Sequence, residues 1–152
     1  MHNKFGKPHG HAIFATGPSN IAVDNLAERI ERVTRKACDV HNRGMPLGRK
    51  DTRQSRPFVV RGYRAALENE ALLRLLQDPT AIAEPDKEFG IAGRWKLPLS
   101  LAFWVLVCLD SRATRDIRTL HTDDHKALHD LHKKLQADSY KGLRDVATEA
   151  IS

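Results

Sequence analysis

The chain has 152 residues, of which 41% are hydrophobic and 29% are charged, and its formal net charge is +6. This length is typical of one domain, and long segments with regular apolar spacing exclude an intrinsically disordered chain. The most apolar run, residues 97–109, is shorter than the ~20 residues that a membrane-spanning helix needs. The first residues contain no apolar signal region. We therefore expect an intracellular protein of the cytoplasm or nucleus, with no membrane partner.

Residues 11–16 are a short apolar run that stops at Gly17-Pro18, which predicts a buried strand ending in a sharp turn. Ser19 follows at the position of a helix N-cap. Behind it, apolar residues recur at spacings of three and four, which predicts a helix of about six turns with one apolar stripe. The stripe comprises Val23, Leu26, Ile30, Val33, Ala37 and Val40. A helix N-terminus at the end of a strand presents free N–H groups and partial positive charge, a geometry that favours phosphate oxygens.

The next segment, residues 41–64, is basic and interrupted by glycine, which predicts a loop followed by a second short strand at residues 57–63. Its basic side chains outnumber the single acidic one, Asp51, by six, which equals the excess of the whole chain. Such an excess attracts polyanions, of which nucleic acid is the commonest. A solvated basic loop is the alternative, because no aromatic residue is interleaved before Phe58. The basic residues are Arg43, Arg49, Lys50, Arg53, Arg56, Arg61 and Arg64.

The rest of the chain predicts helices. The first covers residues 65–77 and ends at Asp78-Pro79. A strongly apolar helix begins at Pro98 and continues to Leu109. A third helix starts at Thr122, where acidic residues follow, and a last one covers residues 140–151. The apolar residues expected to face inward in the first of these helices are Leu67, Ala71, Leu72, Leu75 and Leu76.

Cysteine and histidine offer few candidate sites. Cys38 and Cys108 lie far apart in apolar helical patterns, which predicts buried free thiols rather than a zinc site or a disulfide. The residues His121, His125 and His129 recur every fourth position, so a continuous helix would align them as potential zinc ligands. The glutamate of a His-Glu-x-x-His motif is absent, and a solvated histidine face is the alternative. We therefore assign no metal site and no cofactor to the chain.

A longer pattern follows Gly17, namely Pro18-Ser19-Asn20-Ile-Ala-Val-Asp24-Asn-Leu. It resembles motif Ia of superfamily 1 helicases of the nonsense-mediated-decay type, which lies in the first RecA-like domain and grips the backbone of single-stranded RNA or DNA. The resemblance implies that Pro18, Ser19 and Asn20 contact a nucleic-acid strand and that Asp24 steadies the turn. Gly17 departs from the pattern, because alanine is usual there. Residues 93–104 are loosely similar to helical insertions in fungal members of the family.

The ATP- and Mg²⁺-binding motifs of that family are missing. A phosphate-binding loop needs Gly-x-x-x-x-Gly-Lys-Ser/Thr, and Gly6-Lys7-Pro8 lacks the upstream glycine and the hydroxyl. No Asp-Glu pair followed by glutamine supplies the Walker B function. The resemblance therefore implies a helicase fragment, an α/β partial RecA-like P-loop NTPase domain with one or two strands and a predominantly helical remainder.

Two functions are compatible with this sequence. The first is a motif Ia segment with a basic loop (1–64) followed by a helical insertion (65–152), which retains at most single-stranded nucleic-acid binding and cannot hydrolyse ATP alone. The alternative is a small, mainly helical protein-interaction module that docks through residues 97–109. Any other enzymatic activity and the oligomeric state stay open.

Overall fold

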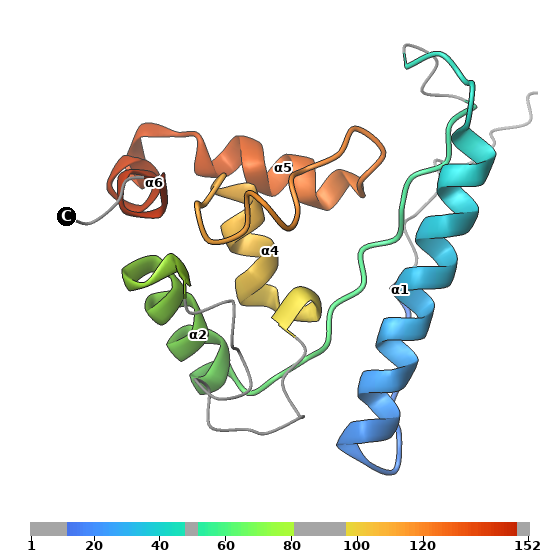
Figure 1. Cartoon of the computed structure of the whole chain (residues 1–152), viewed down its shortest axis with the longest axis horizontal. Helices are drawn as coiled ribbons and strands as arrows, with labels where there is room; N and C mark the ends of the chain where they lie inside the picture. Colours follow the sequence, from blue (N-terminus) through green and yellow to red (C-terminus); the bar gives the residue numbers. More distant parts are fainter. Residues whose placement is uncertain (1–11, 48–51, 81–96, 149–152) are drawn as a thin grey trace, which may run out of the picture.

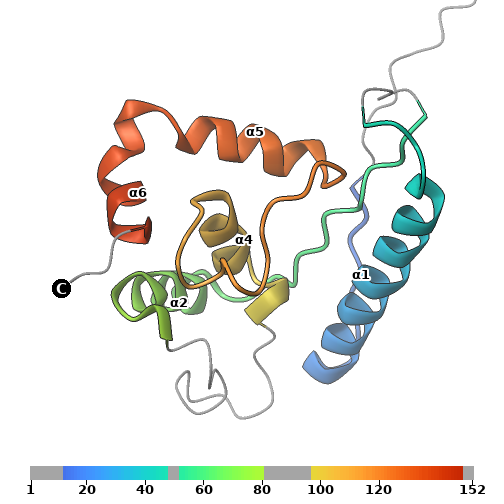
Figure 2. The same cartoon turned by 45° about the horizontal axis from the view of Figure 1, so that its top comes forward.

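The computed structural model describes residues 12–47, 52–80 and 97–148. Two parts are evident in Figure 1: a bundle of short helices, here called the body, and one long helix, α1, that lies beside it. The view in Figure 2 shows the same separation. The α-helices are α1 (Asn20–Asn42), α2 (Ala65–Gln77), α4 (Leu101–Cys108), α5 (Lys126–Leu135) and α6 (Lys141–Thr148), and the short 3-10 turns are η2 (Leu97–Leu99) and η3 (Asp138–Tyr140).

The body is built around α4, whose sequence is apolar on every side. A helix of this kind must be surrounded by other elements, and α4 packs against both α2 and α5. Its N-terminus is capped twice. The Ser100 hydroxyl oxygen accepts a hydrogen bond from the Phe103 N–H at 3.1 Å. The Glu68 carboxylate on α2 accepts from the N–H groups of Leu101 at 3.2 Å and Ala102 at 2.8 Å. Negative charge is favourable at this end of a helix, so Glu68 also joins α2 to α4.

The long helix α1 is attached to the body differently. The principal contacts between described helices join α4 to α2 and α5, and α2 to α6, and α1 is not among them. Between α1 and the body runs an extended segment, residues 52–64, which we call the strap (Figure 1). Its backbone bonds to the body at two points: the Arg56 N–H donates to Asp123 O at 2.6 Å, and the Arg61 N–H donates to Leu99 O at 2.8 Å.

The predicted α/β, partial RecA-like fold is wrong. Among the described residues 12–47, 52–80 and 97–148 there is no strand. Residues 12–17 and most of the strap have no regular secondary structure, and Ile13 and Phe14, which were expected in a buried strand, are exposed. An extended segment becomes a strand only when a neighbouring strand pairs with its backbone groups. Among the described residues, these two segments lie next to helices and side chains rather than next to a strand.

Most of the predicted helices are present, with altered ends. The long helix after Ser19 and the helix over residues 65–77 are confirmed as α1 and α2. The apolar helix starts at Leu101 rather than Pro98, because Pro98 lies in the turn η2. The helix expected from Thr122 begins at Lys126, and the last helix is α6. The loose resemblance over residues 93–104 falls partly outside the described residues.

Residues 97–109 do not offer the docking surface that the alternative function required. The segment supplies much of the hydrophobic core, and Leu101 is its one exposed large apolar residue. Phe103 and Trp104 are buried, which confirms that these aromatic side chains pack in the core. The buried members of the segment are Leu97, Leu99, Ala102, Phe103, Trp104, Leu106, Val107, Cys108 and Leu109.

Candidate interaction surface

The residues predicted to grip nucleic acid lie at the N-terminus of α1, where Pro18, Ser19 and Asn20 are exposed. The predicted N-cap is confirmed, since the Ser19 hydroxyl oxygen accepts from the Ala22 N–H at 3.2 Å. The side chain of Asn20 already has a partner, because its Oδ1 accepts from Arg61 Nη2 at 3.0 Å. The structure therefore brings these three residues together at the surface and connects them to the strap.

Asp24 is separated from that exposed group, because it is buried on the side of α1 that faces the strap. Its Oδ1 accepts from Arg61 Nε at 2.6 Å, and the guanidinium carbon of Arg61 lies 4.8 Å from the centre of the Tyr63 ring. Asp24 and Asn20 thus bind one arginine from two successive turns of the helix. This arginine connects the start of α1 to the strap.

Gly17 makes a close approach to α1. A Cβ atom added at this position would lie 3.2 Å from Val23 Cγ2, closer than ordinary van der Waals contact. The absence of a side chain therefore lets the preceding chain pass next to the first turns of the helix. This contact gives a local reason for glycine where the helicase pattern has alanine.

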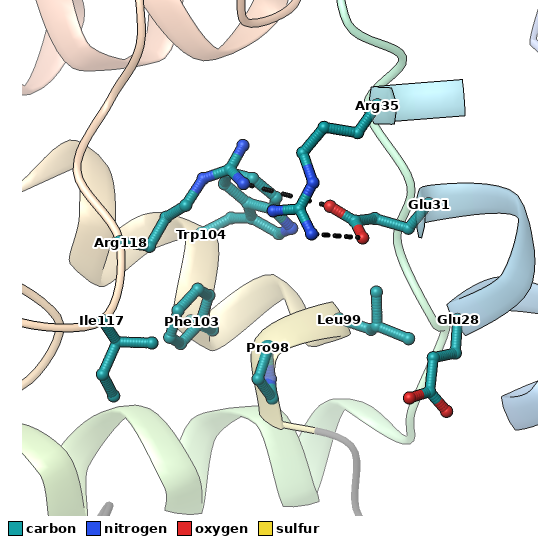
Figure 3. Close-up of a pocket in the computed structure, with 9 residues that line it drawn as sticks. All are labelled: Glu28, Glu31, Arg35, Pro98, Leu99, Phe103, Trp104, Ile117 and Arg118. Atoms are coloured by element: carbon teal, nitrogen blue, oxygen red, sulfur yellow. Dashed lines mark ion pairs between the residues drawn. The ribbon is translucent and has the colours of Figure 1, made fainter. Parts of the chain in front are cut away.

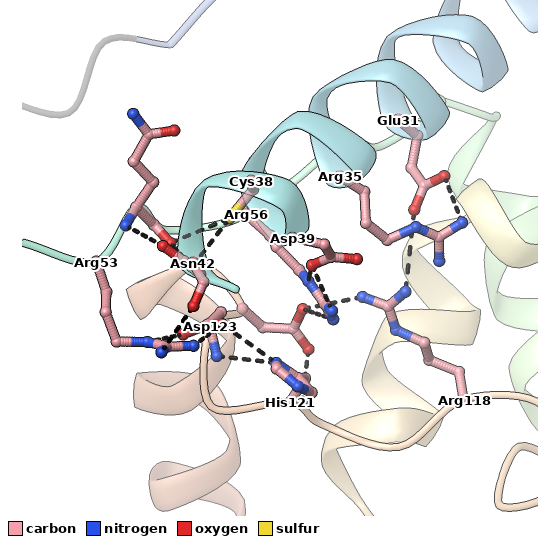
Figure 4. Close-up of polar contacts among 12 residues, drawn as sticks. Glu31, Arg35, Cys38, Asp39, Asn42, Arg53, Arg56, Arg118, His121 and Asp123 are labelled. Atoms are coloured by element: carbon pink, nitrogen blue, oxygen red, sulfur yellow. Dashed lines mark hydrogen bonds and ion pairs between the residues drawn. The ribbon is translucent and has the colours of Figure 1, made fainter. Parts of the chain in front are cut away.

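A second group of ion pairs joins the middle of α1, the strap and the body (Figure 4). Arg56 of the strap contacts Asp39 of α1 at 2.7 Å and Asp124 of the body at 3.5 Å. Asp124 is buried and also accepts from Arg118 Nη2 at 2.9 Å. Arg118 in turn lies 3.9 Å from Glu31 on α1. The interface between α1 and the body is therefore a chain of alternating charges.

Arg53 of the strap is also bound by a carboxylate of the body, that of Asp123. Its Nε donates to Asp123 Oδ1 at 2.8 Å, a second N–H donates to Asp123 Oδ2, and Nη1 donates to Met45 O at 2.7 Å. This two-point contact from Arg53 lowers the pKa of Asp123 below its usual value, although burial acts in the opposite direction. The same hydrogen bond raises the pKa of Arg53. A fork-to-fork contact of this kind fixes orientation as well as charge.

Near the C-terminal end of α1, neutral groups complete the attachment. Asn42 Nδ2 donates to Gln54 O at 2.7 Å and Asn42 Oδ1 accepts from the Gln54 N–H at 2.8 Å, so one side chain satisfies both backbone groups of a strap residue. The thiol of Cys38 donates to the same carbonyl at 3.0 Å. Burial raises the pKa of the Cys38 thiol. Buried Cys38 is a free thiol, as the sequence predicted.

The basic segment is consequently not an open positive patch throughout. Three of the four arginines in the strap bind carboxylates within the protein, namely Arg53, Arg56 and Arg61, and the fourth, Arg64, is exposed. Residues 49–51 lie outside the described residues. Sequence reasoning missed this pairing because the carboxylates come from positions distant along the chain, and charge counts contain no information about such contacts.

The face of α1 turned away from these ion pairs is apolar. Four large members of the predicted stripe are exposed, Leu26 by 39%, Ile30 by 38%, Val33 by 54% and Val40 by 55% of their surface. The residues of α1 that are buried are instead Asp24, Cys38 and Asn42. The helix therefore inverts the usual pattern, with its polar side inward and its apolar stripe outward. A row of exposed basic residues runs along one edge of the stripe, namely Arg29, Arg32, Lys36 and Arg43.

A pocket of 220 Å³ lies between α1 and the body (Figure 3). Its apolar wall comes from the body, and charged side chains of both parts line the rest. The guanidinium of Arg118 lies 4.9 Å from the centre of the Trp104 ring. Trp104 Nε1 and Arg118 Nε have no hydrogen-bond acceptor among the described residues. The lining residues are Glu28, Glu31, Arg35, Pro98, Leu99, Phe103, Trp104, Ile117 and Arg118.

Two of the three regularly spaced histidines, His121 and His125, accept local hydrogen bonds. His121 precedes α5, and its Nδ1 accepts from the Asp123 N–H at 3.1 Å. His125 is the N-cap of α5, where its Nδ1 accepts from the Ala127 N–H at 3.2 Å. Because the helix begins after both, they do not share a helical face with His129. Within the part of the chain that the structure describes, no three histidine, cysteine, aspartate or glutamate side chains are grouped so as to hold a metal ion.

Scans against protein-family models, curated proteins and solved structures find no match. Among the described residues, no helix is both long enough and apolar enough to pass through a membrane. The geometry of α1 and its attachment is therefore the basis for a functional proposal.

Proposed function

We propose that this chain is a helical protein-interaction module in which the body and strap hold α1 so that its apolar stripe receives a helix of another protein. The observation that carries the proposal is the inversion of α1. Ion pairs and hydrogen bonds occupy its inner face, while Leu26, Ile30, Val33 and Val40 remain exposed in one line.

The energetics of the two faces favour this function. Fully burying one side chain of this size is worth about 1.5–3 kcal/mol relative to leaving it exposed. Burying this continuous apolar stripe against a partner is therefore favourable, and an exposed apolar patch of this kind marks an interaction site. The polar attachment lets α1 bind the body without using that stripe.

The test is binding of a synthetic amphipathic helix, with leucine along its seam and glutamine at the bordering positions, to the full-length protein. We expect saturable binding by fluorescence anisotropy, and we expect Val33→Asp to weaken it by more than 10-fold, since a charge would be buried in the new interface. The matched control is Leu73→Asp, because Leu73 is similarly exposed but lies on α2. Absence of binding by the wild-type protein, or equal loss in both variants, would exclude the proposal.

The second candidate function is binding of a single-stranded nucleic-acid backbone, which the resemblance to motif Ia implies. Pro18, Ser19 and Asn20 are exposed, and the polar side chains of Ser19, Asn20 and the basic row along α1 supply the accessible donors that phosphate contacts need. Affinity for a short RNA or DNA strand should then fall by about 0.7 log units per log salt for each phosphate neutralised. Replacing Ser19 and Asn20 together by alanine should weaken the binding. Binding whose affinity does not change with salt concentration would exclude this function.

A further inference from the structure

The spacing of the exposed stripe is that of a coiled-coil seam. Along α1 the apolar positions alternate three and four residues apart without interruption. In heptad notation, the a positions are Val23, Ile30 and Ala37, and the d positions are Leu26, Val33 and Val40. Two helices that carry this repeat pack side by side with each apolar residue inserted between four residues of the neighbour. The shape of the stripe therefore fits one helix lying along α1, rather than a globular surface.

The borders of the seam are unequal in charge. After Ala22, the g positions on one border are Arg29, Lys36 and the C-cap residue Arg43, and these three are basic and exposed. None of them forms an ion pair with any residue that the structure describes. The e positions on the other border are Ala27, Thr34 and His41. Neither border carries an acidic side chain.

A second copy of α1 is poorly suited to this surface. In a parallel pair, g positions face the e positions of the neighbour, where Thr34 and His41 offer no negative charge. In an antiparallel pair, the g positions of the two copies face each other, and Arg29, Lys36 and Arg43 would repel their equivalents. Both orientations leave the basic border without a partner.

We infer that the helix bound by α1 is acidic, with an apolar seam and with glutamate or aspartate at the border positions that face Arg29, Lys36 and Arg43. This inference rests on the proposed function, because it specifies the chemistry of the partner on the same stripe. Apolar contacts along the seam supply affinity, and the border charges select the partner and its register.

The experiment compares three synthetic helices of about four heptads. They share one leucine seam and differ only at the border positions, which are glutamate, glutamine or lysine. Each is titrated into the full-length protein at low and at high salt. Because an exposed pair contributes about twofold, three pairs predict about 10-fold tighter binding of the glutamate helix than of the glutamine helix at low salt. The lysine helix should bind most weakly.

A charge-reversal variant tests the residues themselves. Arg29→Glu with Lys36→Glu should invert the order, so that the lysine helix binds best. The matched control is Lys133→Glu with Lys134→Glu, because these exposed lysines of α5 give the same net charge away from the stripe. The control should keep the preference for glutamate. An inversion in the control as well would mean that net charge, rather than the border, selects the helix, and would overturn the inference.

The remaining outcomes separate the two proposals. Equal affinity for all three helices, with loss in Val33→Asp, overturns the acidic partner and leaves the helix-docking function intact. No binding of any helix overturns both. Tighter binding of vesicles rich in phosphatidylserine, or of a poly(U) strand, than of the glutamate helix would assign the basic border to a membrane surface or to nucleic acid and overturn the inference. Assembly of the protein into dimers that exclude the glutamate helix would also overturn the inference, because a second copy would then occupy the stripe.

Discussion

The body and α1 are held in the fold by different forces. In the body, the short helix α4 is surrounded by apolar side chains of its neighbours, and Leu106, Val107 and Cys108 are fully buried. In α1, the buried residues are Asp24, Asn42 and the thiol Cys38, and the contacts with the strap and body are ion pairs and hydrogen bonds. Apolar burial depends little on salt or pH, whereas charge pairs depend on both.

This difference explains how α1 can be attached to the body and still expose its apolar stripe to a partner. A helix attached to the body through its apolar stripe would have no apolar surface left for a partner. Here the charged attachment sets the position of α1, and the seam from Leu26 to Val40 stays exposed. Each part also contains one buried thiol, Cys38 on α1 and Cys108 on α4, so thiol labelling reports on the two regions separately.

The largest contrast should come from truncating apolar side chains in the two regions. Phe103→Ala in α4 should lower the free energy of unfolding by about 3–5 kcal/mol, because it leaves a cavity in the core. Val33→Ala in α1 should change it by less than about 0.5 kcal/mol, because Val33 is exposed in the free protein. Denaturant unfolding followed by circular dichroism measures both. Similar losses would mean that the stripe of α1 is packed in solution.

The next effect concerns the ionic attachment. Arg61→Ala should cost about 3 kcal/mol, because it leaves the carboxylate of Asp24 buried without its partner. The loss should appear as release of α1 rather than as unfolding of the body. Labelling of Cys38 should therefore accelerate by about 100-fold, since 1.4 kcal/mol corresponds to a factor of ten. Labelling of Cys108 should not change.

The control for this experiment is Arg64→Ala, since Arg64 is an exposed arginine three positions further along. It should leave both labelling rates as they are. Cys108 labels slowly for a second reason, because burial raises the pKa of its thiol to about 11. Equal acceleration of both thiols in Arg61→Ala would show that α1 and the body unfold as one unit.

Acid should act on the attachment before it acts on the core. Arg53 holds the pKa of Asp123 below its usual value, so this pair contributes stability that is complete above the ordinary aspartate pKa of about 3.9. The contribution is lost as pH falls through the lowered pKa of the folded state. We expect the radius of gyration to rise below about pH 4 while the helical signal of the body persists. Asp123→Asn, which removes this titration, should show a smaller change across the same range.

The sequence was a good guide to local structure and a poor one to which face is buried. The N-cap at Ser19 and the bounds of α2 followed from residues within a few positions of each other, so the sequence pattern contained them. The orientation of α1 depends on Asp24 meeting Arg61 and on Asp39 meeting Arg56. These contacts join distant segments, and no periodicity reports them.

The predicted strands failed for a related reason. The apolar run before Gly17 and the Val59-Val60 pair match strand propensities, but a sheet also needs a neighbouring strand, which a single segment cannot reveal. The candidate site was predicted in part. Pro18, Ser19 and Asn20 do lie together at a helix N-terminus, whereas the exposure of the apolar stripe could be recognised only after the inner face of α1 was known.

The smallest effect compares two serine N-caps, one in each region. Ser19 begins α1 and is exposed, and its hydroxyl oxygen accepts one bond, from the Ala22 N–H. Ser100 begins α4 and is fully buried, and its hydroxyl both accepts from the Phe103 N–H and donates to Leu97 O at 2.7 Å.

Replacing either serine by alanine removes a cap, which typically costs about 1 kcal/mol. At Ser19, water can replace the lost partner, so the cost should fall below about 1 kcal/mol and be limited to faster hydrogen exchange in the first turn of α1. At Ser100, the Phe103 N–H would lose its acceptor away from water, while the Leu97 carbonyl would keep only its bond from the Ser100 N–H, which should raise the cost to about 2 kcal/mol for the whole body. Denaturant unfolding with hydrogen exchange separates the two results. Equal costs would mean that the start of α1 is as well protected as the core, and the contrast between an ionic and an apolar region would then not extend to the helix ends.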